Sequence, residues 1–335
     1  MIMVVVRMEE PPTGKYAVIG ASGLIGSHVL LGLASKPNIS VLAVSHERPA
    51  RVSAPNITPV FANAKDSDSL AHKIEGTDFV VMAAGIPATA PVLARDPVGT
   101  VLSNLYIFIG ALSAAYQIGC KRCVWLSGTT GFPAVNGEIT EEIMFQGDPP
   151  ESWYGIGWAN RFLETQCQWY SEKVPKPLPI TILRPSMVYG EYANFDDKTA
   201  HFLPSLIKRV VHRNDPIEVW GNGEQTRDLI YAGDVSKAIF LALKSDKNFS
   251  TYNLGSGKIY SINECLSLLV GLDGYRDATI KYMLDKPSST KKQCISIDLI
   301  KAELGFTPSV ELKTGLRRTL NWYKKTHYVQ DSIDL

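Results

Sequence analysis

Short apolar runs alternate with longer amphipathic stretches through the first half of the chain. Each short run has the length of a buried strand, and each longer stretch repeats its apolar residues with the period of a helix. This alternation predicts an α/β fold built on a doubly wound parallel sheet with helices on both faces. The expected strands are 16–20, 39–45, 79–83, 123–127 and 180–184, and the expected helices are 24–34, 67–74, 98–117 and 154–171.

The charge of the chain is balanced, with 34 basic and 33 acidic residues and a net charge of +1. Such a chain has no overall field that attracts nucleic acid or an anionic membrane, so we expect neither as a partner. The longest apolar stretch, 105–115, is shorter than the roughly 18 residues that span a bilayer. The start of the chain lacks the basic segment of a signal peptide and soon meets Glu9 and Glu10. We therefore expect a cytoplasmic protein.

Five cysteines are too few and too scattered for a disulfide framework. Cys120 and Cys123 have the spacing of a zinc-ligand pair, but the other three cysteines do not supply a second pair. We interpret both as small buried residues at the start of a strand, and we expect no metal site.

A glycine-rich turn, Gly20-Ala-Ser-Gly23-Leu-Ile-Gly26, lies between the first expected strand and the first expected helix. Glycine at these positions permits a tight turn, close approach of backbone N–H groups to a pyrophosphate, and close packing of the helix. The positive end of the helix dipole favours the same negative charge. In this strand–turn–helix context the motif predicts a dinucleotide site in a Rossmann-type domain.

The second half of the chain is richer in loops. We expect residues 14–185 to form the NAD(P)-binding Rossmann domain, completed by the segment at about 217–245. Residues 186–216 and 246–330 are then expected to form a smaller substrate-binding α/β region. The elements expected in this half are a strand over 217–220 and helices over 203–212, after Asp234, over 261–269 and over 310–323.

The residue that usually selects NAD is missing from this site. An acidic side chain at the end of the second strand would accept the ribose hydroxyls of NAD, but Ser45, His46 and Arg48 stand there instead. Because Arg48 can pair with a 2′-phosphate, we expect NADP as the cofactor. NAD remains the alternative if Arg48 is only a solvated charge in a loop.

Further motifs follow in a fixed order along the chain. Together with the glycine turn they resemble the extended short-chain dehydrogenase/reductases of the nucleotide-sugar epimerase, dehydratase and reductase group, from about residue 16 to about residue 323. Within that group, Asn194-Phe195 and the segments 201–204 and 221–228 are most similar to the GDP-fucose synthase type. The motifs are Ala83-Ala84-Gly85, Asn104, Trp125-Leu126-Ser127, Tyr154-Gly155, Arg184-Pro185, Val188-Tyr189-Gly190, 220–228 and 232–235.

The resemblance implies a nucleotide-sugar substrate and a set of binding residues. Arg227 matches the arginine that pairs with the substrate diphosphate, a contact that a bidentate guanidinium makes well. Arg209, Thr130 and Asn194 are the other implied substrate contacts, and Asn63 stands where the family usually has Asp beside the adenine. The implied cofactor contacts are Gly20, Ser22, Gly23, Leu24, Ile25, Gly26, His46, Arg48, Asn63, Ala64, Ala83, Ala84, Gly85, Tyr154, Pro185 and Val188.

The reacting centre departs from the family. Family members have Tyr-x-x-x-Lys, in which the ammonium stabilises the phenolate and binds the nicotinamide ribose. Here Tyr154 is followed four residues later by Trp158. A neutral indole with one N–H donor cannot replace that ammonium.

Two further catalytic positions differ. The family's Ser or Thr at the reacting oxygen falls on Gly128, between Ser127 and Thr129, so these two hydroxyls are the catalytic candidates beside Tyr154. The histidine that acts as an acid in the GDP-fucose synthase type falls on Tyr192.

Three functions remain open. In the first, the chain is an enzyme in which Tyr154 donates a proton, Thr129 or Thr130 replaces the lost hydroxyl, and Arg161 supplies positive charge. Losing one acid–base group without such compensation costs on the order of 10² to 10⁴ in rate. In the second, the chain binds cofactor and nucleotide but performs no hydride chemistry. In the third, it is a reductase of a small molecule that is not a nucleotide.

The helices expected over 98–117 and 154–171 carry more apolar side chains than one core-facing stripe needs, among them Tyr106, Phe108, Phe162 and Trp169. Enzymes that the chain resembles pair these helices in a four-helix bundle. We therefore expect a homodimer.

Overall fold

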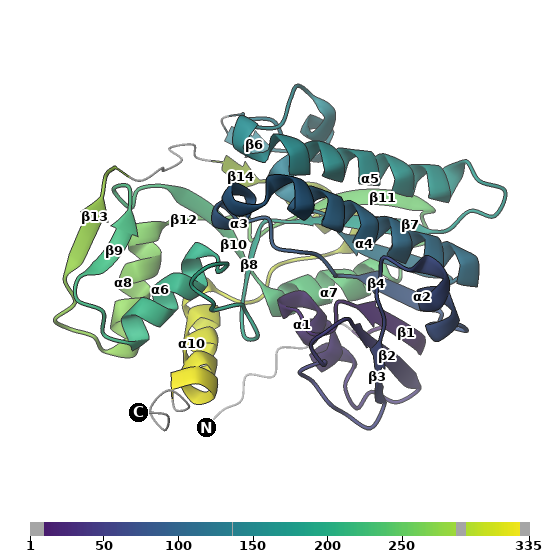
Figure 1. Ribbon diagram of the computed structural model, residues 1–335, viewed down its shortest axis with the longest axis horizontal. Coiled ribbons are helices and arrows are strands. Elements are labelled where there is room, and N and C mark those ends of the chain that lie inside the picture. The colour runs from purple at the N-terminus through teal and green to yellow at the C-terminus, as the bar shows by residue number, and fades with distance from the viewer. Residues whose placement is uncertain (1–9, 136, 286–292, 329–335) are drawn as a thin grey trace.

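The computed structural model of the protein describes residues 10–135, 137–285 and 293–328 (Figure 1). Its centre is a seven-stranded sheet in the order β11-β7-β5-β4-β1-β2-β3, and every neighbouring pair is parallel. The expected α/β fold is confirmed. The strands are β1 (Gly14–Ile19), β2 (Ile39–Ser45), β3 (Ile57–Phe61), β4 (Phe79–Met82), β5 (Arg122–Leu126), β7 (Ile180–Pro185) and β11 (Phe249–Leu254).

Helices cover both faces of this sheet, as Figure 1 shows. Successive residues of β1 point to opposite faces, so that Val18 packs in one core cluster while Ala17 and Ile19 pack in the other. Because both faces are covered, β4 is buried at every position, which explains its apolar sequence. The helices of the first face are α1 (Leu24–Leu33) and α7 (Ala232–Ala242), and those of the second are α2 (Ser67–Lys73), α4 (Pro97–Ile118) and α5 (Tyr154–Glu172).

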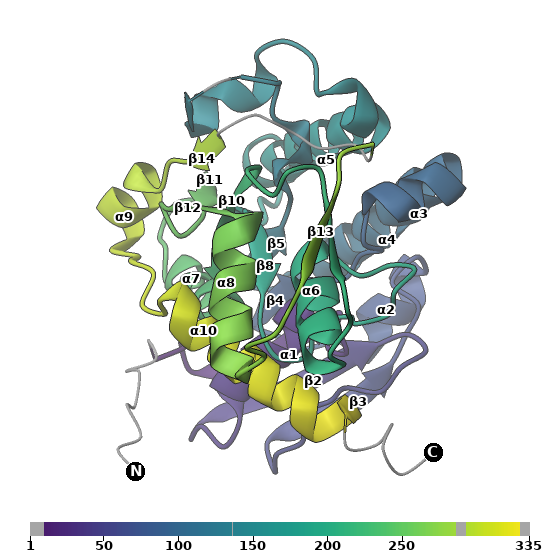
Figure 2. The same cartoon turned by 90° about the vertical axis from the view of Figure 1, so that its left-hand side faces the viewer.

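A smaller region follows β7 along the chain and has its own hydrophobic core. Figure 2 faces this region, with α8 and β13 in front of the sheet domain. Three small sheets complete it, in the orders β12-β10-β8, β13-β9 and β14-β6. The elements of this region that follow β7 are β8 (Met187–Tyr189), α6 (Phe202–Val211), β9 (Ile217–Trp220), β10 (Thr226–Tyr231), β12 (Ile259–Ser261), α8 (Ile262–Asp273), β13 (Ile280–Met283), β14 (Gln293–Ile295) and α10 (Leu312–Tyr323). The strand β6 (Gly137–Ile139) comes before β7 and pairs with β14. Two further helices connect the sheet domain: α3 (Ala90–Arg95) precedes α4, and α9 (Asp298–Leu304) packs against β11.

The strand over 217–220 does not complete the main sheet, contrary to the prediction. As β9 it pairs with β13 in the smaller region, and the seventh strand of the main sheet is β11. The helix predicted after Asp234 does belong to the sheet domain, where it packs beside α1 as α7. The sequence of β11 mixes polar and apolar residues, because its buried Ser250 and Asn253 form hydrogen bonds with Thr181 and with the carbonyl of Ile139. That mixed pattern concealed the strand.

Among the described helices, α4 is long and apolar enough to cross a membrane by length and composition alone. Phe108, Ala111 and Leu112 of this helix are buried in the core that also contains residues of α2 and α5. A core helix with one apolar face against the sheet and another against neighbouring helices has the same composition as a membrane span.

The two closely spaced cysteines are small buried residues, as interpreted from the sequence. Cys120 and Cys123 lie in the core beneath α4, with their Sγ atoms 3.5 Å apart. Burial raises the pKa of the Cys123 thiol well above its usual value, so the sulfur is protonated and unreactive.

Candidate cofactor and nucleotide-sugar site

The turn after β1 has a backbone that only glycine permits. Gly20 has a φ of +94°, and a Cβ there would lie 2.6 Å from the backbone nitrogen of Ala84. A Cβ on Gly26 would lie 2.2 Å from the carbonyl oxygen of Gly20, so α1 approaches the turn more closely than any other residue would allow. Gly23 is the N-cap of α1 and offers no side chain, which leaves the first N–H groups of the helix to a bound anion or water. The turn fits a pyrophosphate.

The other expected cofactor residues of this edge lie on neighbouring elements. Ser22 lies in the turn just before α1, and Leu24 and Ile25 are the first two residues of that helix. Leu24 packs against the core of the smaller region, and Ile25 packs against the core of the sheet domain. Pro185 is buried at the end of β7, and Val188 is half-buried in β8. The carboxyl ends of β1, β4 and β7 therefore lie along one edge, where dinucleotides bind in doubly wound sheets.

The segment after β4 is held in place by α4. Asn104 accepts a hydrogen bond from the backbone nitrogen of Ile86 at 2.8 Å and donates one to the Ile86 carbonyl at 3.1 Å. A Cβ on Gly85 would lie 3.1 Å from Oδ1 of Asn104. This anchor fixes the Ala83-Ala84-Gly85 turn against the glycine turn.

The expected adenine contacts lie in the loop after β3. Asn63 is exposed, and its Oδ1 already accepts a hydrogen bond from the backbone nitrogen of Lys65 at 3.0 Å. Ala64 is buried, and α4 approaches it so closely that a Cβ on Gly110 would lie 2.1 Å from its carbonyl oxygen. The amide of Asn63 therefore offers its nitrogen more readily than its oxygen to a bound base.

Basic side chains gather in the loop after β2. His46 lies 3.6 Å from the carboxylate of Glu47, whereas Arg48 makes no ion pair with any described residue. Arg51 donates a hydrogen bond to the carbonyl of Tyr192 at 3.1 Å. Burial and the charge of Arg48 lower the pKa of Arg51. Sequence reasoning missed Arg51, although an arginine three residues after Arg48 was a visible signal.

Tyr154 is the first residue of α5, and its side chain is 52% exposed. Trp158, one turn later, is 42% exposed, and the two rings meet edge to face with centroids 6.4 Å apart. The position that carries an ammonium in the resembled family is therefore occupied by an accessible indole beside the tyrosine.

Arg161 lies beneath Trp158, with its guanidinium carbon 4.7 Å from the indole centroid. Its Nε donates to the carbonyl of Gly131 at 2.9 Å and its Nη1 to the carbonyl of Gly147 at 2.7 Å. The side chain is 2% exposed, and burial lowers its pKa. Arg161 therefore ties two loops to α5, and these contacts do not direct its charge to the hydroxyl of Tyr154.

The loop after β5 carries the hydroxyls expected to replace the missing one. Thr129 begins the short 3₁₀ turn Thr129–Gly131, and its hydroxyl makes no hydrogen bond to another described residue. Thr130 accepts a hydrogen bond from Nδ2 of Asn160 at 2.9 Å. A Cβ on Gly128 would meet Asn160 at 3.4 Å, an ordinary contact, so this position has room for a serine.

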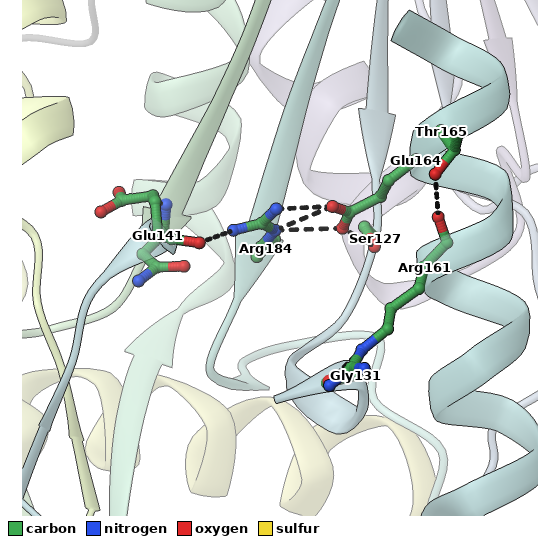
Figure 3. A network of polar contacts seen from close by, with 8 residues as sticks. Ser127, Gly131, Glu141, Arg161, Glu164, Thr165 and Arg184 are labelled. Atoms are coloured by element: carbon green, nitrogen blue, oxygen red, sulfur yellow. Dashed lines mark hydrogen bonds and ion pairs between the residues drawn. The ribbon is translucent and has the colours of Figure 1, made fainter. Parts of the chain in front are cut away.

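Ser127 belongs to a buried polar network that joins β5, α5 and β7 (Figure 3). Its hydroxyl donates to Glu164 at 2.8 Å, and Glu164 accepts three further hydrogen bonds from Arg184 at 2.5 to 3.2 Å. Arg184 also donates to the carbonyl of Glu141 at 3.0 Å. Glu164 and Arg184 are each 2% exposed. The hydroxyl of Ser127, which was expected to be catalytic, is therefore hydrogen-bonded to a buried structural ion pair.

Arg227 is the expected substrate residue whose charge is left uncompensated. It is half-buried in β10, where its Nη1 donates to the carbonyl of Thr226 at 2.7 Å. Burial lowers its pKa, and no carboxylate of the described chain pairs with it. A part-buried guanidinium without a partner is suited to an anionic ligand.

The other expected substrate residues have partners within the protein. The guanidinium of Arg209 is bound to the carbonyl of Glu218. Asn194 donates to the hydroxyl of Thr199 at 2.7 Å and accepts from the backbone of Asp196 at 3.1 Å, so its side chain closes its own loop.

Tyr192 has a left-handed backbone, with a φ of +68°. Its ring lies 6.0 Å from that of His28 and 5.3 Å from that of Trp322, measured between centroids. These contacts are with α1 and α10, so the residue at the family's histidine position packs away from Tyr154.

Residues 16–255 match the family model described as the NAD dependent epimerase/dehydratase family. This stretch contains the glycine turn, the anchored segment after β4, Tyr154 and Arg227. The chain belongs to the NAD-dependent epimerase/dehydratase family. A nicotinamide dinucleotide is thus the cofactor of its family, and the backbone of the glycine turn fits it.

Known members of the epimerase/dehydratase family resemble the chain over nearly its full length. GDP-L-colitose synthase of Yersinia pseudotuberculosis is 24% identical over 92% of this chain and 97% of its own. GDP-L-fucose synthase 1 of Arabidopsis thaliana is 24% identical over 93% of this chain and 94% of its own. UDP-glucuronic acid 4-epimerase of Bacillus cereus, solved with UDP-glucuronic acid and NAD, superposes with a TM-score of 0.80 at 23% identity, over 93% and 100% of the two chains.

Proposed function

We propose that the protein is an NAD(P)-dependent epimerase, reductase or dehydratase of a nucleotide-activated sugar or deoxysugar, with an altered reacting centre. The observation that carries this proposal is the uncompensated guanidinium of Arg227 in the smaller region, in a chain that keeps the family's glycine turn. The relatives named as GDP-sugar synthases support a nucleotide diphosphate as the recognised group.

The residues of this chain have distinct roles in the proposal. The nicotinamide, when bound, supplies or accepts the hydride. Tyr154 holds a proton at its hydroxyl for the reacting oxygen, and Thr129 offers the hydroxyl that Gly128 lacks. The exposed indole of Trp158 lies beside the ring of Tyr154, where the resembled enzymes have an ammonium.

A panel of nucleotide sugars tests the proposal. We expect GDP- and UDP-linked sugars to raise the melting temperature in the presence of NADPH, because a ligand that binds only the native state stabilises it by linkage. Arg227→Gln is expected to weaken this binding by about ten- to a hundredfold, since a charge-assisted hydrogen bond is worth about 1.5–3 kcal/mol. Arg276→Gln, which changes an exposed arginine between α8 and β13, is the matched control. Equal losses in the two variants would contradict the role of Arg227.

The cofactor preference can be measured separately. We expect NADPH to bind more tightly than NADH, because Arg48 and Arg51 both stand in the loop after β2 and a guanidinium pairs well with a 2′-phosphate. Arg48→Gln should reduce the preference about tenfold, the size of one charged contact, without changing the affinity for NADH. Fluorescence titration with both cofactors measures the preference. Tighter binding of NADH than of NADPH by the wild-type protein would rule out the role of Arg48 in binding a 2′-phosphate.

A catalytically silent binding protein is the second candidate. Trp158 and Gly128 favour it, because both replace groups that take part in proton transfer in the resembled enzymes. Binding of NADPH and of a nucleotide sugar without any turnover is the result expected of this alternative.

We also propose a homodimer built on α4 and α5. Leu102, Tyr106 and Ile109 of α4 are 43 to 56% exposed, and Phe162 and Trp169 of α5 are 50% and 48% exposed. Apolar surface of this extent on two neighbouring helices is typical of an interface. Light scattering at micromolar concentration should give twice the chain mass of 36.8 kDa. Tyr106→Glu should shift the protein towards the monomer, and a wild-type monomer would contradict the proposal.

A further inference from the structure

A second cavity, of about 410 Å³, lies away from the glycine turn and from Tyr154. Residues of α1, α7 and α10 and of the loop after β8 line it. None of the residues assigned above to cofactor or substrate contributes to its lining. A cavity of this size has room for a small organic molecule.

One wall of this cavity is a buried polar cluster. His28 of α1 is 5% exposed, with its Nε2 atom 3.2 Å from the backbone oxygen and 3.6 Å from the carboxylate of Glu191. The hydroxyl of Tyr231 donates to the same carboxylate at 2.6 Å. Burial lowers the pKa of His28 although Glu191 opposes this, so the imidazole is neutral near pH 7. The Glu191 carboxylate is thus held by the Tyr231 hydroxyl beside His28, and within the described chain it forms no ion pair with Arg318 or Lys237.

The second acidic residue in the lining is also satisfied. The two carboxylate oxygens of Asp234 accept hydrogen bonds from the backbone and hydroxyl of Ser309, at 3.0 and 2.6 Å, and from the backbone of Val310 at 3.0 Å. These bonds join α7 to the segment before α10. Asp234 thus closes one side of the cavity without neutralising the cations beside it.

Two cations of the lining keep their charge available. The guanidinium carbon of Arg318 lies 5.6 Å from the ring centre of Tyr231, and Lys237 donates only to the carbonyl of Thr307, at 3.3 Å. Neither forms an ion pair with a carboxylate in the described ranges of the chain. The half-buried rings of Trp322 and Tyr192 complete the lining. Unpaired cations beside flat aromatic faces match a ligand that is both planar and anionic.

We propose that this cavity is a second ligand site, which takes a small planar aromatic molecule bearing one carboxylate or phosphate. Arg318 and Lys237 bind the anion, and Trp322 and Tyr192 contact the ring. The site also touches the cofactor loop, because the carbonyl of Tyr192 accepts the hydrogen bond from Arg51. A ligand in contact with Tyr192 is therefore placed to alter the binding of a cofactor 2′-phosphate.

Fluorine NMR with 4-fluorophenyl phosphate tests the site on the full-length protein. The ligand resonance is expected to broaden on addition of protein and to stay broadened with excess NADPH present, because the two sites are separate. Arg318→Gln should weaken binding about tenfold, as the loss of one charged contact implies. Arg317→Gln, the neighbouring exposed arginine of α10, should change it less than twofold. Lys237→Gln provides a second variant, on a different helix, with the same expected direction.

Each other outcome overturns a stated part of the proposal. Recovery of the sharp ligand resonance with NADH as well as with NADPH would place the ligand in the cofactor site. Equal binding of neutral 4-fluorobenzyl alcohol would remove the anion-binding role of Arg318, and equal competition by inorganic phosphate would remove the role of the aromatic rings. No broadening at millimolar ligand would exclude the site. None of these results depends on whether the protein turns over a nucleotide sugar.

Discussion

Glu164→Gln is expected to lower the free energy of unfolding by about 3–5 kcal/mol, the usual effect of removing one partner from a buried ion pair. Arg184 is 2% exposed and receives its only carboxylate contact within the described chain from Glu164. Without that charge, Arg184 keeps only neutral partners: the amide oxygen that replaces the carboxylate, the Glu141 carbonyl and the face of Phe132, 5.5 Å from its guanidinium carbon. Urea unfolding of wild type and variant measures the difference.

Two controls separate the charge from the local packing. The double variant Glu164→Gln with Arg184→Met removes both charges and should recover most of the loss, because an apolar replacement of a buried pair is often neutral. Asp197→Asn removes an exposed partner of Lys208 and should cost less than about 1 kcal/mol. If Glu164→Gln itself lowers the free energy of unfolding by less than about 1 kcal/mol, the stability of the fold does not depend on the buried ion pair.

Trp158→Lys combined with Gly128→Ser should raise hydride transfer by about 10² to 10⁴ if the reacting centre has only lost its acid–base groups. The structure allows both changes: position 128 has ordinary contacts for a Cβ, and the side chain at 158 is 42% exposed. Gln168→Lys, which adds a lysine at another exposed position of the same helix, is the matched control. The assay uses NADPH and a nucleotide 4-keto-6-deoxysugar.

The pH profile of the wild type distinguishes an adapted site from a lost one. If Tyr154 works as a proton donor beside a neutral indole, turnover should persist into the alkaline range and fall as the phenol ionises. Turnover that rises with pH through neutrality would contradict this role. A double variant that binds NADPH differently but stays inactive would indicate instead that the indole sets the position of the nicotinamide.

Much of the sheet domain was predictable because its signals are local. Strands such as β4 are buried on both faces and therefore read as unbroken apolar runs, and α1 follows a turn whose glycines lie next to one another in the sequence. Local signals did not predict that β11, rather than β9, joins the main sheet. Both are short strands, and which one joins the main sheet depends on the packing of α7 and on the partner β13.

The candidate site likewise contains residues that the sequence identified and contacts that only the fold reveals. Arg227 was found from its motif, whereas Arg51 was missed although it stands three residues after Arg48, and only the fold shows its contact with the carbonyl of Tyr192. The hydroxyls of Ser127 and Thr129 are equivalent in the sequence. Their separation arises because Glu164, 37 residues after Ser127, lies within 2.8 Å of its hydroxyl.

The sequence by itself determined the fold class, the cofactor turn and the loss of the lysine beside Tyr154, because each depends on residues that are near neighbours along the chain. Only the tertiary structure decided how the side chains are used. It showed that Arg161 binds two loop carbonyls, that Arg227 remains without a carboxylate partner in the described chain, and that α1, α7 and α10 enclose a second cavity. The physical reason is that burial and charge compensation are set by residues distant in the sequence, which only the folded chain brings together.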